Sequence, residues 1–166
     1  MSAVVVYESM WGNSEAVARA VAEGLGEGTA LIEVTQAAQR LPVDVGLLVV
    51  GGPTHAFSMS RPTTRADAVK QGAPTGHETR GIREWLDDLP PSTGIDVATF
   101  DTRVAKVRHL PGSAARKAAK EVRRRHLGHV VDTESFYVEG VDGPLLEGEL
   151  ERARDWGARL AAHAPV

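Results

Sequence analysis

The sequence predicts an α/β fold in which helices cover both faces of an open, doubly wound parallel sheet. Apolar runs typical of strands alternate with amphipathic runs typical of helices along the chain. Residues 45–50 are apolar throughout, as in a strand that is covered on both faces. A length of 166 residues with 42% hydrophobic residues fits one domain over residues 1–166.

The first elements follow from local patterns. Residues 3–7 are a Val-rich apolar run and predict a strand, whereas residues 13–25 place apolar side chains at helical spacing. Three glycines then end this helix, and the apolar runs 30–34 and 45–50 predict the second and third strands. A helix between the first two strands is the crossover that parallel strands require.

The middle of the chain has a long connection. Residues 51–76 are rich in Thr, Pro, Ser and Gly, and we expect one or two helical turns within them, around residues 64–70. A helix is predicted at 77–89, where apolar side chains fall on one side and two prolines follow. The fourth strand is predicted at 95–100.

The last third adds two helices and a strand. An Ala-rich helix is predicted over 113–125, capped by Ser113, with small side chains that allow close packing on the sheet. A fifth strand is predicted in two parts, 129–131 and 135–138, and a final helix at 147–161. The side chains expected to face inward at this end are Leu146, Leu150, Ala153 and Leu160.

The composition excludes several kinds of chemistry. The chain has no cysteine, which excludes disulfides, thiolate catalysis, iron–sulfur ligation and cysteine-based zinc sites. It has no Gly-Lys followed by Ser or Thr, as mononucleotide loops require, and no convincing set of metal ligands. No window approaches the ~20 apolar residues of a membrane span. We therefore expect a cytoplasmic protein without a metal, whose redox chemistry would come from an organic cofactor.

The loop Ser9 to Ser14 lies between the first predicted strand and the first predicted helix. A helix amino terminus has unpaired backbone N–H groups, and its dipole favours an anion. Ser9, Asn13 and Ser14 add side-chain hydrogen bonds, and the loop contains no Lys or Arg. Gly12 permits close backbone approach. A phosphate site and an ordinary helix cap both fit this spacing and remain open.

Three loops together resemble those of the flavodoxin family. S-x-x-G-N-S at residues 9–14 is similar to the loop that holds the phosphate of flavin mononucleotide (FMN) in flavodoxins. VVGGPTHAFSMSRP at 49–62 resembles the second flavin-contacting loop, and FDTR at 100–103 falls where the third begins. The resemblance covers essentially the whole chain. It implies a flavodoxin-like five-stranded parallel sheet, strand order 2-1-3-4-5, that binds FMN non-covalently.

By this resemblance the phosphate lies on the first loop and the isoalloxazine ring lies between the second and third. The implied cofactor-binding residues are Ser9, Met10, Trp11, Gly12, Asn13, Ser14, Pro53, Thr54, His55, Ala56, Phe57, Phe100, Asp101, Thr102 and Arg103. The third loop lacks the Trp and Tyr that commonly flank the ring in flavodoxins, so Phe57, His55 or Trp11 is expected to replace them. Arg103 either places positive charge near the reduced flavin or belongs to a basic segment.

Basic residues are concentrated at 103–125. This segment has nine Lys and Arg and one acid, a net charge of +8 against −3 for the chain, which leaves −11 for the remaining residues. Flavodoxin electron carriers are usually acidic. The segment is therefore a solvated helix face, or it binds a redox partner protein with an acidic docking face, or the protein is not a simple shuttle.

We predict an FMN-binding flavoprotein that carries electrons to a redox partner protein, with neither a membrane nor a nucleic acid as partner. One alternative is an FMN-dependent oxidoreductase acting on a quinone or similar acceptor, for which the long second loop would shape a substrate pocket. Another is a cofactor-free flavodoxin-fold binding module that docks through its Arg-rich helix. The sequence favours a carrier over a stand-alone enzyme and indicates no catalytic side chain.

Overall fold

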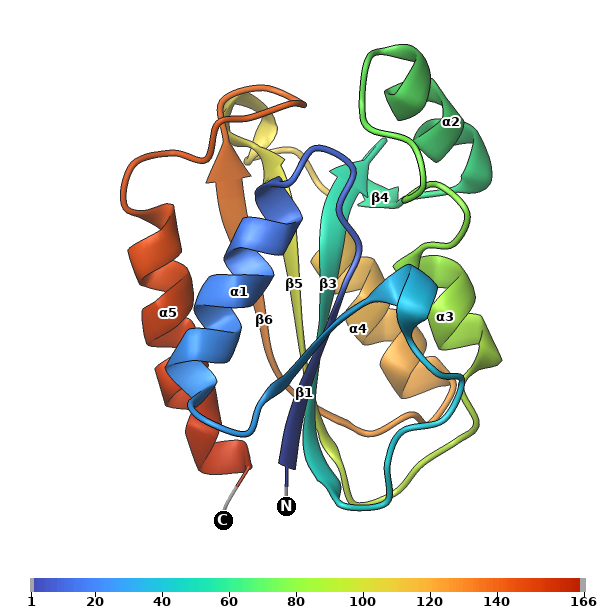
Figure 1. Cartoon of the computed structure of the whole chain (residues 1–166), viewed down its shortest axis with the longest axis vertical. Helices are drawn as coiled ribbons and strands as arrows, with labels where there is room; N and C mark the ends of the chain where they lie inside the picture. The colour runs from blue at the N-terminus through green and yellow to red at the C-terminus, as the bar shows by residue number, and fades with distance from the viewer. Residues whose placement is uncertain (1, 165–166) are drawn as a thin grey trace.

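A computed structural model describes residues 2–164, which form a central sheet between two layers of helices (Figure 1). The strands are β1 (Ser2–Tyr7), β2 (Ala30–Glu33), β3 (Val45–His55), β4 (Ser58–Met59), β5 (Asp96–Val104) and β6 (His129–Val138). The α-helices are α1 (Asn13–Leu25), α2 (Pro62–Lys70), α3 (Ile82–Asp88), α4 (Ala114–Arg124) and α5 (Glu149–Leu160). Short 3-10 helices are η1 (Val34–Gln36), η2 (Ala105–Val107) and η3 (Ala161–His163).

The predicted doubly wound parallel sheet is confirmed. Strands β2, β1, β3, β5 and β6 lie side by side in that order and are parallel. This is the order 2-1-3-4-5 when the short β4 is left out. Strand β4 pairs antiparallel with the end of β3, and this hairpin was not predicted. The winding reverses between β1 and β3, where open sheets of this kind form a crevice beyond the carboxyl ends of their strands.

Each face of the sheet has its own apolar core because side chains alternate along the strands. Val4 of β1 lies in a cluster with Trp85 of α3 and with Ala114 and Ala118 of α4. Val5 lies in the opposite cluster with α1 and α5, where Phe100 packs edge-on against Trp156 at 6.3 Å between ring centroids. Burying one such side chain contributes about 1.5–3 kcal/mol. The two cores hold the sheet rigidly beneath the loops at its carboxyl edge.

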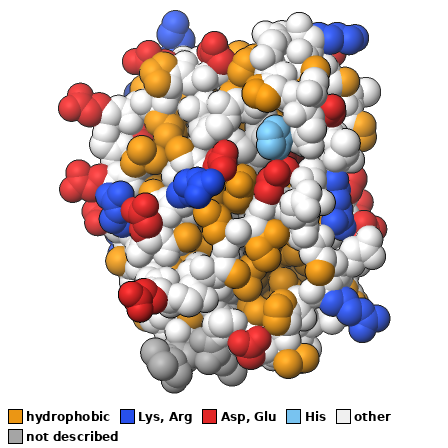
Figure 2. Space-filling model, viewed as in Figure 1, with side chains coloured by type: hydrophobic (Ala, Val, Ile, Leu, Met, Phe, Trp, Pro, Cys, Tyr) orange, Lys and Arg blue, Asp and Glu red, His pale blue; other side chains and the backbone are white. Residues whose placement is uncertain are grey.

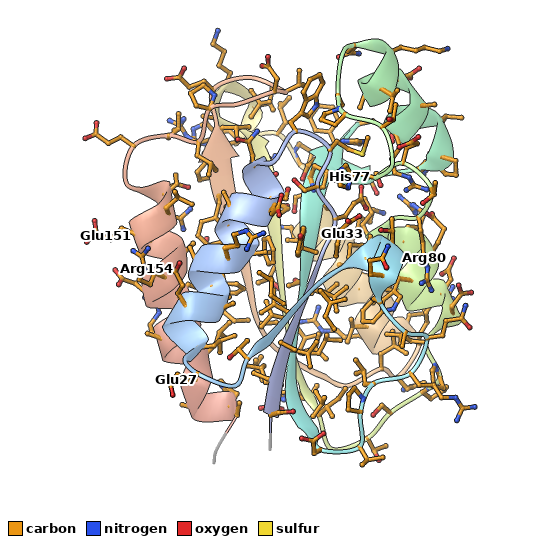
Figure 3. All side chains as sticks on the ribbon, in the orientation of Figure 1. Glu27, Glu33, His77, Arg80, Glu151 and Arg154 are labelled. Atoms are coloured by element: carbon orange, nitrogen blue, oxygen red, sulfur yellow. The ribbon has the colours of Figure 1, made fainter. Side chains whose placement is uncertain are left out.

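Helices α1 and α5 approach closely through two glycines. A Cβ on Gly24 would overlap the carbonyl oxygen of Arg154, and a Cβ on Gly157 would overlap that of Val21. Only glycine permits such close contact between backbones. Arg154 also pairs with Glu23 of α1 at 2.9 Å, and Figure 3 shows where Arg154 lies on α5. These contacts fix the position of α1, whose amino terminus lies within residues 9–14.

Three predicted boundaries were wrong at the centre of the chain. The strand predicted at 95–100 continues as β5 to Val104, because its last residues still pair with β6. Strand β3 continues to His55 because its last residues still pair with β5 and β4. The helix predicted at 77–89 begins only at Ile82. The residues before Ile82 lie instead near the end of β2, where the His77 Nδ1 is 3.1 Å from a carboxylate oxygen of Glu33 (Figure 3).

Two predictions near the carboxyl terminus were also wrong. Strand β6 is continuous, because a shift of register against β5 just before Asp132 accommodates the extra residue. Leu150 is exposed in the first turn of α5, because Glu149 occupies the inward position there. Ala153 and Leu160 are buried as predicted.

Candidate functional site

A cleft of about 230 Å³ opens at the carboxyl ends of β1, β3, β5 and β6. Its walls are the loop after β1, the β3–β4 hairpin, helix α2 and the ends of β5 and β6. Many of the predicted site residues meet there: Ser9, Met10, Trp11, Asn13, Ser14, Pro53, Thr54, His55, Ala56, Thr102 and Arg103. Three segments that are far apart in sequence therefore form one site.

The loop after β1 leaves the amino terminus of α1 open. Gly12 is the N-cap residue with φ of 95°, a left-handed conformation that favours glycine. The Ser9 hydroxyl accepts a hydrogen bond from the Gly12 backbone N–H at 3.1 Å, so the turn before the helix is closed. Gly12 has no side chain to cap the helix, and within residues 2–164 no other side chain caps the first turn of α1. The N–H groups and the positive end of the helix dipole remain available to an anion.

Two contacts place the first turn of α1 against other loops. The Ser14 hydroxyl lies 2.7 Å from the Thr102 hydroxyl, which ties the helix to the end of β5. The Asn13 side chain lies against Gly143, so closely that a Cβ there would come within 2.7 Å of the amide oxygen. Both side chains therefore have fixed positions at the phosphate end of the predicted site.

The β3–β4 hairpin forms a second wall. His55 pairs with Ser58 across a two-residue turn in which Ala56 and Phe57 have φ of 48° and 62°. The His55 Nδ1 lies 3.0 Å from the Thr64 hydroxyl of α2. Burial, with a smaller contribution from a nearby arginine, lowers the pKa of His55 to about 4, so the ring is neutral at pH 7. Phe57 is exposed and is not part of the cleft lining.

Helix α2 forms a third wall together with the loop after β1. Met10 and Trp11 pack with Ala68 of α2 and with Ala73 in a small apolar cluster. Met10 is buried, whereas Trp11 is half-buried and lines the cleft. Trp11 is therefore both a packing residue and a wall of the cleft.

The four predicted residues of β5 divide between the core and the cleft. The Phe100 ring lies over Gly51 inside the core, so it does not reach the cleft. Asp101 is buried and accepts a hydrogen bond at 3.0 Å from the Ala115 N–H in the first turn of α4, beside the cap that Ser113 forms as predicted. Burial raises the pKa of this carboxyl group. Thr102 and Arg103 line the cleft.

Arg103 brings a buried positive charge to the site. Its Nη2 donates to the carbonyl oxygens of Val107 and Leu110 at 3.2 and 3.1 Å, which holds the loop after β5. Its Nε is buried without a hydrogen-bond partner, and no carboxylate within residues 2–164 pairs with the guanidinium. A buried cation of this kind is costly unless an anion compensates it.

A buried polar network beneath the cleft was missed by sequence reasoning. Glu8 is buried and accepts hydrogen bonds from the Ser60 hydroxyl at 2.5 Å and the Ile82 N–H at 2.9 Å. Arg65 of α2 is also buried and donates to Ser60 at 2.7 Å and to Glu84. Burial raises the pKa of Glu8, while these hydrogen bonds and Arg65 oppose the rise. The one signal for this network in the sequence was Glu8, an acidic residue directly after an apolar strand.

Other lining residues lay outside the predicted set: Thr64, Asp67, Ala68, Gln71, Val104, Val138 and Val141. Within residues 2–164 no cluster of His, Asp and Glu side chains could hold a metal ion. Every helix in the described part of the chain is too short or too polar to cross a bilayer.

No protein-family model and no curated protein sequence matches the chain. Solved flavodoxin structures do match over almost the whole length of both chains. A flavodoxin from the domain Archaea is 18% identical with a TM-score of 0.62, covering 99% of each chain. Flavodoxin 1 from Bacillus cereus is 15% identical with a TM-score of 0.66, covering 98% of this chain and 99% of that one. The Streptococcus pneumoniae TIGR4 flavodoxin is 18% identical, with a TM-score of 0.62 over 98% of this chain and 99% of its own. The chain therefore has the flavodoxin-like fold.

Proposed function

We propose that the cleft binds FMN non-covalently and that the protein exchanges electrons with a redox partner protein. The observation that carries this proposal is the open amino terminus of α1 at one end of the cleft. It offers backbone N–H groups and a positive dipole end without any Lys or Arg in the loop. The unpaired Arg103 adds a second reason for an anionic ligand.

The residues present fit FMN at both ends of the cleft. The first turn of α1, with Ser9, Asn13 and Ser14, would hold the phosphate through backbone and side-chain hydrogen bonds. Trp11 and the backbone of residues 53–56 would cover the ring system and exclude water from it. Bound FMN would supply the ability to accept and release one or two electrons, which the side chains of this cysteine-free chain lack.

A visible spectrum tests the cofactor. The chain is purified from cells grown with ample riboflavin, mixed with excess FMN and freed of unbound ligand. We expect flavin absorbance that stays with the protein and quenched flavin fluorescence. Colourless protein that also leaves the fluorescence of added FMN unchanged would refute the proposal.

A second candidate function is an FMN-dependent oxidoreductase acting on a quinone or a similar acceptor. The observation in its favour is the wall that α2 adds to the cleft through Thr64, Asp67 and Gln71, since a wall of this kind can shape a substrate pocket. The assay is NADH or NADPH oxidation by the FMN-loaded protein with a quinone and no other protein. Turnover under these conditions favours the enzyme, whereas its absence favours the carrier.

A further inference from the structure

The basic segment carries exposed cations from the loop beside the cleft to the last turn of α4. Arg103 and Val104 line the cleft, and the loop that follows them leads directly into α4. The exposed cations of the loop and helix that form no ion pair within residues 2–164 are Lys106, Arg108, Arg116, Lys117, Lys120 and Arg123. The α4 members fall on one face of the helix because its alanines and Val122 are buried against the sheet.

Two exposed apolar side chains lie at the end of this surface that precedes α4. Phe57 is 44% exposed at the tip of the β3–β4 hairpin, and Leu110 is 48% exposed in the loop before α4. The hairpin and the loop are in contact, because a Cβ on Gly112 would lie 3.1 Å from the Phe57 Cβ. The rim of the cleft therefore presents apolar contacts, and unpaired cations flank it on the α4 side.

We propose that this surface, from Phe57 and Leu110 along the exposed face of α4, docks a redox protein that presents carboxylates around an apolar contact. The proposal rests on the proposed electron-carrier function, because it brings the partner to the edge of the same cleft. The charge of this docking surface is opposite to that of the acidic surface that is usual for flavodoxin electron carriers.

Charge distribution supports an acidic partner and sets its orientation. The segment 103–125 carries +8, while the remainder of the chain carries −11. On the face shown in Figure 2, acidic and basic side chains are interspersed, and α1 and α5 lie on the opposite side of the sheet from α4 (Figure 1). Such an asymmetric molecule turns its basic side, and with it the rim of the cleft, toward an acidic surface.

A protein partner explains the surface better than a nucleic acid does. Single-stranded nucleic acid is bound by aromatic side chains interleaved with cations, whereas residues 103–125 contain no Phe, Tyr or Trp and Phe57 lies at one end of the surface. Protein interfaces instead combine an apolar centre with a polar rim. Phe57 and Leu110 beside the charged face of α4 match that arrangement.

The test uses a strongly acidic [2Fe–2S] ferredoxin as the probe, with binding measured at low and at high ionic strength. The variant Lys117→Glu/Lys120→Glu reverses two unpaired cations of α4. The matched control, Arg40→Glu/Arg159→Glu, makes the same charge change at two exposed arginines that form no ion pair within residues 2–164. A DNA oligonucleotide, single-stranded and duplex, is titrated in parallel.

We expect salt-sensitive binding of the ferredoxin that the α4 variant weakens by about tenfold or more at low ionic strength, while the control changes it by less than about threefold. Equal weakening by both variants, no salt-sensitive binding, or tighter binding of DNA than of ferredoxin would overturn the proposal. Binding is measured with and without FMN. Ferredoxin binding by a chain that takes up no flavin would leave the docking surface supported and refute the proposed cofactor.

Discussion

Replacing Asn13 with Asp is expected to separate the binding of FMN from that of riboflavin. Asn13 is the first residue of α1, lines the cleft and is held against Gly143. Asp has almost the same shape, so the change adds a negative charge at the end of the cleft with little change in packing. Riboflavin has the same ring system as FMN and lacks the phosphate.

Two interactions of the new carboxylate bear on the size of the effect, and neither strengthens the binding of a phosphate. A carboxylate in the first turn of a helix stabilises the free protein by about 0.3–1 kcal/mol. The same carboxylate repels a phosphate: two unit charges about 4 Å apart interact by roughly 1 kcal/mol in water and roughly 4 kcal/mol at a protein surface. A phosphate near −1.5 to −2 in charge should therefore bind at least about tenfold more weakly.

The assay is quenching of flavin fluorescence, with a matched control in the same cleft. Gln71→Glu makes the same amide-to-acid change on the α2 wall, where Gln71 is exposed. We expect Asn13→Asp to weaken FMN binding by at least about tenfold and riboflavin binding by less than about twofold. For Gln71→Glu we expect similar, small changes for both ligands. If Asn13→Asp weakens both flavins by the same factor, the phosphate does not lie at this helix terminus.

Three further predictions concern the scaffold that holds the site, and urea unfolding measures each of them. Gly157→Ala should lower the free energy of unfolding by about 1–3 kcal/mol, because the added Cβ overpacks against α1. The control Ala158→Gly, at an exposed position, should cost only about 1 kcal/mol through lower helix propensity. A Gly157→Ala variant more stable than the original protein would refute the close contact. Burial raises the pKa of Asp101, so its contribution to stability is present below the unfolded pKa of about 3.9 and is lost as the pH rises through the folded value. Asp101→Asn should therefore lose less stability than the original protein between about pH 4 and pH 7, and an unchanged pH profile would contradict this. Arg65→Met removes the buried cation that bonds Ser60 and pairs with Glu84, and should cost about 3 kcal/mol. The exposed Lys70→Met should cost less than about 0.5 kcal/mol, and equal effects would refute the network.

The sheet was predictable because its signal is local. Apolar runs such as 45–50 identify buried strands, and the glycines after the first helix mark its end. The site was partly predictable for the same reason, since parallel strands end at one edge and their following loops meet there. Sequence spacing alone left the loop 9–14 open between a cap and an anion site. The structure contributes the finding that, among residues 2–164, no side chain caps the first turn of α1.

The remaining features depend on contacts between distant residues. Phe100 was expected in the cleft, yet its position on β5 directs it into the core over Gly51. Helix α2 is held near the cleft by Arg65, which is linked to the buried Glu8 through the Ser60 hydroxyl; these residues are far apart in sequence and lack a local pattern. The β3–β4 hairpin was missed because the third strand was predicted to end at residue 50. The two residues of the hairpin turn adopt positive φ without being glycine, so the sequence carries no turn signal there.

A crystal structure of the chain grown with FMN tests the central claim most directly. We expect the phosphate within hydrogen-bond distance of the backbone N–H groups in the first turn of α1, close to Ser9 and Asn13. The ring system should lie in the cleft beside Trp11 and the β3–β4 hairpin. A flavin bound elsewhere on the molecule, or one with its phosphate away from α1, would contradict the account.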